Sequence, residues 1–193
     1  MNRTKAKVTL LVGLGFLGGM MPRGIADESN QKTIFTFSDP VEIPGQVLLA
    51  GTYVFKLADS ESDRDIVQVF NKDETYLYGT FLAIPDQRLR PAGKPIITFD
   101  EAPAGSPEAV RAWFYPGDTY GHEFVYPKTE ALALAKANNT PVASMPAELA
   151  ENTKKPATTM KEPQVVAMSQ AHLTAQKPTG DEAEIAEVFA PSK

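Results

Sequence analysis

The residues best suited to chemistry lie together in the stretch 113–126, which combines aromatic rings, acids and one of the two histidines. A turn signal, Pro116-Gly117-Asp118, divides this stretch and predicts a β-hairpin. On a hairpin tip, aromatic rings could stack against a sugar or another apolar ligand face, while polar side chains supply hydrogen bonds. The residues that would form such a ligand site are Trp113, Tyr115, Asp118, Tyr120 and His122.

The same hairpin has a second interpretation, in which most of its rings belong to the core. Side chains alternate between the two faces of a strand, so Trp113 and Tyr115 share one face and Phe114 takes the other. Half of these rings must therefore be buried in any sheet. The pattern favours a core hairpin whose polar residues lie on the surface.

Metal binding and catalysis need more convergent groups than this stretch offers. His122 and Glu123 are neighbours on a predicted strand and point to opposite faces, whereas a zinc site takes three or four protein ligands. The chain contains no cysteine and no G-x-S-x-G nucleophile motif. We therefore expect no metal and no cofactor. A small hydrolase or glycan-active enzyme, using His122 with Asp118 or Glu123, is the alternative to a non-enzymatic protein.

The N-terminus has the three-part pattern of a secretory signal peptide. Residues 1–7 carry three basic residues and no acid, and an apolar run without a charge follows. Gly24 and Ala26 place small residues before a plausible cleavage point at Asp27. We therefore expect residues 1–26 to be removed and the mature chain to be exported to the periplasm or the medium.

The apolar run also contains the pattern G-x-G-x-x-G at residues 13–18, which binds a dinucleotide when it joins a strand to a helix. Pro22 would interrupt that helix, and no alternation of helices and strands follows. The run is shorter than the roughly 20 residues of a membrane-spanning helix. We expect no nucleotide and no membrane span in the mature chain.

The charge of the chain limits its partners. The formal net charge is −5, from 19 basic and 24 acidic residues. Loss of the leader would remove four basic residues and no acid, which leaves −9. An acidic chain of this kind is a poor binder of nucleic acid. The partner is left open between a glycan and an envelope protein.

Residues 27–139 have the pattern of an all-β domain. They hold fifteen of the 17 aromatic residues, and short β-branched and aromatic segments alternate with turn signals. This pattern predicts a small antiparallel sandwich or barrel. A helix is expected over residues 128–137, where Ala131, Leu134 and Ala135 form a narrow apolar stripe that closes one end of the sheet. Turn geometry is the expected role of Gly45, Gly51 and Gly117.

Residues 140–193 differ sharply in composition. They hold six prolines and few large hydrophobic residues, so they predict a disordered tail that cannot offset its chain entropy by burial. A short helix over residues 181–189 could dock onto a partner or remain a solvated turn. The tail could also tether the domain to a surface or an assembly.

Two motifs lie between residues 35 and 73. They read Phe35-x-Phe37, Val41-x-Ile43-x-Gly45-x-x-Leu48-x-Ala50-Gly51-Thr52-Tyr53, and then Val67-x-Val69-Phe70-Asn71-Lys72-Asp73. Together they resemble a family of uncharacterised exported bacterial β-domains. The resemblance implies a secreted all-β domain and no particular reaction, and residues 96–126 do not share it.

Taken together, the sequence predicts an exported, non-enzymatic β-domain with a binding or structural role in the periplasm or cell envelope. The absence of a complete catalytic motif carries this expectation. The stretch 113–126 is its predicted contact surface.

Overall fold

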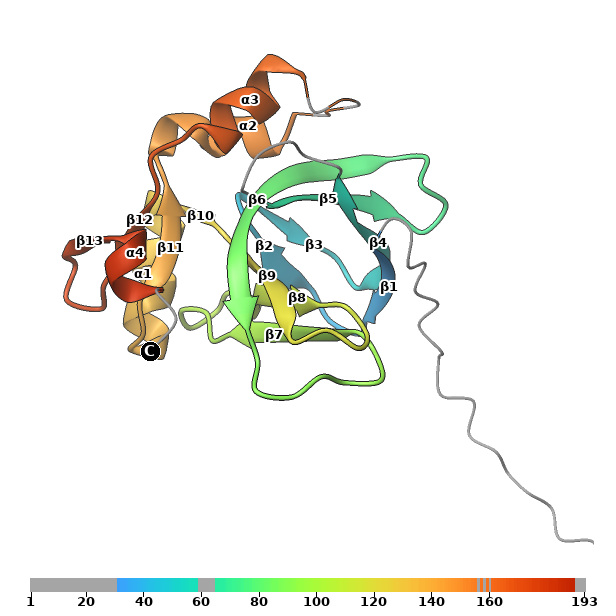
Figure 1. The fold of residues 1–193 in the computed structure, drawn as a ribbon, viewed down its shortest axis with the longest axis horizontal. Helices are drawn as coiled ribbons and strands as arrows, with labels where there is room; N and C mark the ends of the chain where they lie inside the picture. Colours follow the sequence, from blue (N-terminus) through green and yellow to red (C-terminus); the bar gives the residue numbers. More distant parts are fainter. Residues whose placement is uncertain (1–30, 59–64, 156, 158, 160, 190–193) are drawn as a thin grey trace, which may run out of the picture.

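The computed structural model describes residues 31–58, 65–155, 157, 159 and 161–189. The expected signal peptide, residues 1–26, lies outside these described residues. Within them the chain is mostly β, with one large sheet, one small sheet and several short helices (Figure 1). The all-β, sandwich-like class predicted from the sequence is confirmed. Among the same residues, no helix has the length and apolar character needed to cross a membrane.

The large sheet has the strand order β1-β4-β5-β6-β9-β8-β2-β3, and β7 pairs with β8 beside that path. The pairings are antiparallel except for a single parallel bridge between β2 and β8, at Glu42 and Ala109. The strands are β1 (Lys32–Phe37), β2 (Val41–Ile43), β3 (Gln46–Leu48), β4 (Gly51–Ala58), β5 (Asp65–Asn71), β6 (Leu77–Gln87), β7 (Ile96–Asp100), β8 (Ala109–Phe114) and β9 (Tyr120–Phe124).

Buried side chains, many of them aromatic, fill the interior of the large sheet. We call this set of side chains the inner cluster. Phe55 lies at its centre, with ring centroids 6.3 Å from Trp113 and 6.2 Å from Phe124 in edge-to-face contacts. The polar atom of the indole is also satisfied, because Trp113 Nε1 donates a hydrogen bond to Thr33 Oγ1 at 3.2 Å. Large rings with satisfied polar atoms can be buried without an unpaired donor.

The helix α1 (Lys128–Asn138) follows the large sheet, as the sequence predicts. Its buried residues are Ala131, Leu134 and Ala135, and all three belong to the inner cluster. The expected apolar stripe is therefore confirmed.

The expectation of a disordered tail is corrected for the described part of residues 140–189. Here the chain forms the small sheet β10-β11-β12-β13 and short helices, which lie to one side of the large sheet (Figure 1). The elements are β10 (Tyr126–Pro127), β11 (Val142–Met145), η1 (Ala147–Leu149), α2 (Ala150–Thr153), α3 (Pro163–Ser169), β12 (Thr174–Gln176), β13 (Glu182–Glu184) and α4 (Ile185–Val188).

A second hydrophobic cluster, which we call the outer cluster, explains why this segment packs. Ile66, Leu82 and Ile84 of the large sheet are buried together with Met145 and Leu173 of the C-terminal segment. Strands β5 and β6 are thus covered on both faces. The small side chains of the C-terminal segment are enough to bury the second face, because the large sheet already supplies the bulky residues of that layer.

The three predicted turn glycines do not share one role. Gly45 and Gly117 have φ angles of +78° and +88°, a left-handed conformation that strongly favours glycine. Gly51 is not among the glycines with a positive φ, because it already lies in β4 opposite Phe37. Its assignment as a turn glycine is therefore corrected: it begins a strand.

Candidate functional site

The structure places most of the predicted hairpin site in the core. Trp113 is 0% exposed and Tyr115 is buried, and both belong to the inner cluster, as strand alternation allows. Asp118 is half-buried in the turn, whereas Tyr120 is 67% exposed. The five predicted residues therefore do not form one surface, and Tyr120 alone presents an open ring.

His122 is held from both sides beneath Trp113. Its Nδ1 lies 2.6 Å from Asp65 Oδ2, its Nε2 lies 3.1 Å from Gln31 Oε1, and its ring centroid is 5.1 Å from that of Trp113. These contacts tie β9 to the start of β5 and to the approach to β1. Glu123 belongs to the other face of β9, so the two side chains do not converge on one reacting group.

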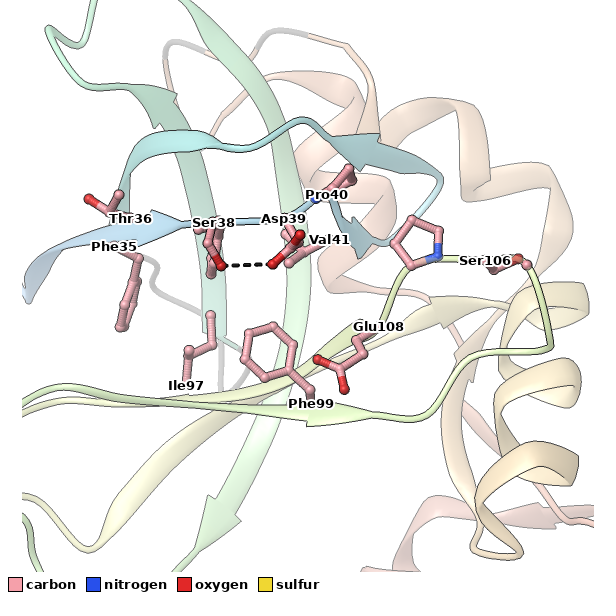
Figure 2. Close-up of a pocket in the computed structure, with 13 residues that line it drawn as sticks. Phe35, Thr36, Ser38, Asp39, Pro40, Val41, Ile97, Phe99, Ser106 and Glu108 are labelled. Atoms are coloured by element: carbon pink, nitrogen blue, oxygen red, sulfur yellow. Dashed lines mark hydrogen bonds between the residues drawn. The ribbon is translucent and has the colours of Figure 1, made fainter.

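A groove between β1 and β7, shown in Figure 2, is a hollow that the sequence did not predict. Its volume is about 810 Å³. We call it the β1–β7 groove. Its lining residues are Phe35, Thr36, Phe37, Ser38, Asp39, Pro40, Val41, Ile97, Phe99, Gly105, Ser106, Pro107 and Glu108.

The floor of the β1–β7 groove is apolar and aromatic. Phe35 on β1 faces Ile97 and Phe99 on β7 across the groove (Figure 2). The ring of Phe37 stacks on Phe35 at 6.3 Å and meets Phe99 edge-to-face at 6.2 Å between centroids. Phe99 remains 36% exposed, so part of this floor is open to a ligand.

Strand topology explains why the groove exists. Among the strands of the described residues, β1 pairs with β4 alone and β7 pairs with β8 alone. β1 and β7 are therefore edge strands, as β3 is elsewhere in the sheet, and no backbone pairing joins β1 to β7 across the groove. Each such edge carries backbone N–H and C=O groups that can pair with another strand.

Two carboxylates give the rim of the groove a negative charge. Asp39 and Glu108 are both exposed, and Ser38 Oγ donates a hydrogen bond to Asp39 Oδ2 at 2.8 Å. None of the residues that line the groove is a lysine or an arginine. A cationic ligand would therefore meet no like charge within the groove itself.

The alternating rings Phe35 and Phe37 are visible in the sequence and indicate one aromatic strand face. The groove depends on bringing that face to β7, about 60 residues along the chain. No local pattern predicts such a long-range neighbour, and this is why sequence reasoning missed the groove.

A second hollow of about 550 Å³ lies against β6 and β9, and we call it the β6–β9 pocket. Glu123 lines it and is only 5% exposed. Burial raises the pKa of Glu123 to about 7, and Asp86 and Asp100 add to this rise while Arg111 opposes it. The other lining residues are Pro85, Asp86, Gln87, Arg88, Leu89, Thr119, Tyr120 and Phe189.

Comparison with protein-family models, with curated proteins and with solved structures finds no match for this chain. The resemblance to exported bacterial β-domains therefore stays a prediction, and the function has to be argued from the two hollows themselves.

Proposed function

We propose that this chain is an exported, non-enzymatic β-domain that binds an extended peptide segment of an envelope protein in the β1–β7 groove. The observation that carries the proposal is the pair of unpaired strand edges on either side of an aromatic floor. An extended segment that joins such an edge gains backbone hydrogen bonds along its length.

The groove also supports a particular kind of segment. Side chains of a bound strand alternate, so every second one would lie over Phe35 and Phe99 while the others face the solvent. Apolar residues suit the floor, and basic residues suit the rim formed by Asp39 and Glu108. The proposed partner therefore alternates aliphatic and basic residues over the five or six positions that β7 and β1 span.

A pair of synthetic peptides tests the binding. The probe is a ten-residue peptide of alternating valine and lysine, and its control carries proline in place of alternate valines, which removes the hydrogen-bond donors of a strand. Fluorescence anisotropy at about 0.15 M salt measures affinity, and amide shifts in β1 and β7 locate the site. Equal binding of both peptides, or binding of neither, contradicts the proposal.

Charge reversal of the rim supplies a matched control. The double variant Asp39→Lys/Glu108→Lys is expected to weaken binding of the alternating peptide about tenfold. Glu148→Lys/Glu187→Lys makes the same change of net charge on exposed residues of η1 and α4. If both double variants weaken binding equally, the effect reflects net charge and not the groove.

Export is tested separately, because the leader pattern alone supports it. The full-length chain is expressed in a bacterial host, and cell fractions are examined by mass spectrometry. We expect a periplasmic species that begins at Asp27, and Ala26→Arg should prevent its cleavage. An intact chain confined to the cytoplasm would refute export while leaving the peptide test unaffected.

A further inference from the structure

The β6–β9 pocket is lined by a buried carboxyl group, Glu123, and by a guanidinium nitrogen of Arg88 that has no hydrogen-bond partner among the described residues. Glu123 is 5% exposed, and the guanidinium nitrogen, Arg88 Nη1, is a buried donor. A buried polar group of this kind is costly unless it is paired. A ligand in the β6–β9 pocket that brings a hydroxyl or amide group could supply the missing partner.

The charges around the pocket favour a neutral ligand. Because burial raises the pKa of Glu123 to about 7, the carboxyl group is protonated in mildly acidic solution. Asp86 and Arg88 then line the pocket with opposite charges, and Arg88 lies over the ring of Phe114 at 5.4 Å. The pocket thus offers many hydrogen-bonding groups and little net charge.

Aromatic rings flank the same pocket. Tyr120 is 67% exposed at the rim, and Phe189 lines the pocket from the C-terminal segment. A sugar ring presents an apolar C–H face to an aromatic ring and hydroxyl groups around its edge, which matches an exposed ring beside several polar side chains.

We propose that the β6–β9 pocket binds a saccharide unit, which stacks on Tyr120 and forms hydrogen bonds with Asp86 and Glu123. The site shares no lining residue with the β1–β7 groove, so it is independent of the proposed peptide binding. A chain with both sites would connect a protein segment to a glycan.

Titration of the purified full-length chain with disaccharides tests this site. The probes are cellobiose, maltose and N,N′-diacetylchitobiose, followed by NMR shifts of backbone amides at pH 6. At least one probe is expected to cause saturable shifts at Gln87, Thr119 and Tyr120. The proposal is overturned if none of the three disaccharides causes such shifts at tens of millimolar. It is also overturned if the aromatic cation benzylamine, used as a comparison probe, binds in the pocket and the disaccharides do not.

Variants then separate binding from folding. Tyr120→Ala should weaken saccharide binding about tenfold, the loss expected for one aromatic contact. Tyr76→Ala is the matched control, because Tyr76 is 61% exposed in another part of the surface. Glu123→Leu should keep the fold and abolish binding. Saccharide binding that is unchanged in Tyr120→Ala and Glu123→Leu contradicts the proposal.

Discussion

The inner and outer clusters share strands β5 and β6 as a common wall but differ in the side chains that fill them. The inner cluster contains large rings, among them Trp113, Phe55 and Phe124, all within the predicted β-domain. The outer cluster contains aliphatic side chains of the wall, such as Leu82, against alanine, valine and methionine from the C-terminal segment. A segment whose one phenylalanine, Phe189, is only partly buried can therefore still be part of a fold when it covers a sheet face that another region has built.

The largest effect should come from removing the outer layer. A chain that ends at Asn139 exposes Ile66, Leu82, Ile84 and Val125, each of which contributes about 2 kcal/mol when buried. That loss approaches the whole stability of an ordinary domain. We expect the truncated chain to lose its cooperative thermal transition in circular dichroism. An unchanged transition would show that the inner cluster folds alone and that the outer cluster is dispensable.

The next test compares one residue from each cluster. Trp113→Ala removes a fully buried ring and its hydrogen bond to Thr33, and it should lower the free energy of unfolding by about 3–5 kcal/mol. Leu173→Ala removes a buried aliphatic side chain of the outer cluster and should lower it by about 2–3 kcal/mol. Urea denaturation measures both. A larger loss for Leu173→Ala would reverse the proposed ranking of the clusters.

Glu123 on β9 should make the stability of the chain depend on pH. Burial raises the pKa of Glu123 from its ordinary value of 4.5 to about 7 in the folded chain, so the folded state binds its proton more tightly than the unfolded state. Stability therefore falls as the pH rises from about 4.5 to about 7, by about 3 kcal/mol at most. Glu123→Gln should match the parent at pH 5 and exceed its stability at pH 8.

Thermal denaturation across this pH range checks that prediction, with Glu148→Gln as an exposed control. Glu42, Asp100 and Glu130 also have pKa values raised by burial, so some pH dependence should remain in Glu123→Gln. An identical pH profile for Glu123→Gln and the parent chain would contradict the assignment.

The smallest effect is expected at the exposed end of the same hairpin. Tyr120→Ala should change the free energy of unfolding by less than about 0.5 kcal/mol, because the ring is largely outside both clusters. Urea denaturation of Tyr120→Ala and of Trp113→Ala compares the loss of an exposed ring with the loss of a buried ring in the same hairpin. A loss of several kcal/mol would place Tyr120 in the packed wall and remove it as a stacking platform.

The sequence predicted what depends on local pattern. Alternation correctly assigned Trp113 to the core as one of two interpretations, and the apolar stripe of α1 was found at the right residues. The ordered C-terminal segment was missed, although the unbroken run Phe81-Leu82-Ala83-Ile84 signals a strand buried on both faces and hence a covering layer. Neither hollow was found, because each joins strands or segments that are far apart along the chain.

The short stretch from β9 to β10 has a mechanical consequence. The backbone passes from the large sheet into the small one through Val125, whose N–H donates to Leu82 O at 3.0 Å, and Tyr126 then pairs with Ser144 in parallel. Val125 is held in the outer cluster and Tyr126 in the inner one. A force that pulls on the small sheet therefore acts directly on the large sheet, because Val125 alone separates β9 from β10.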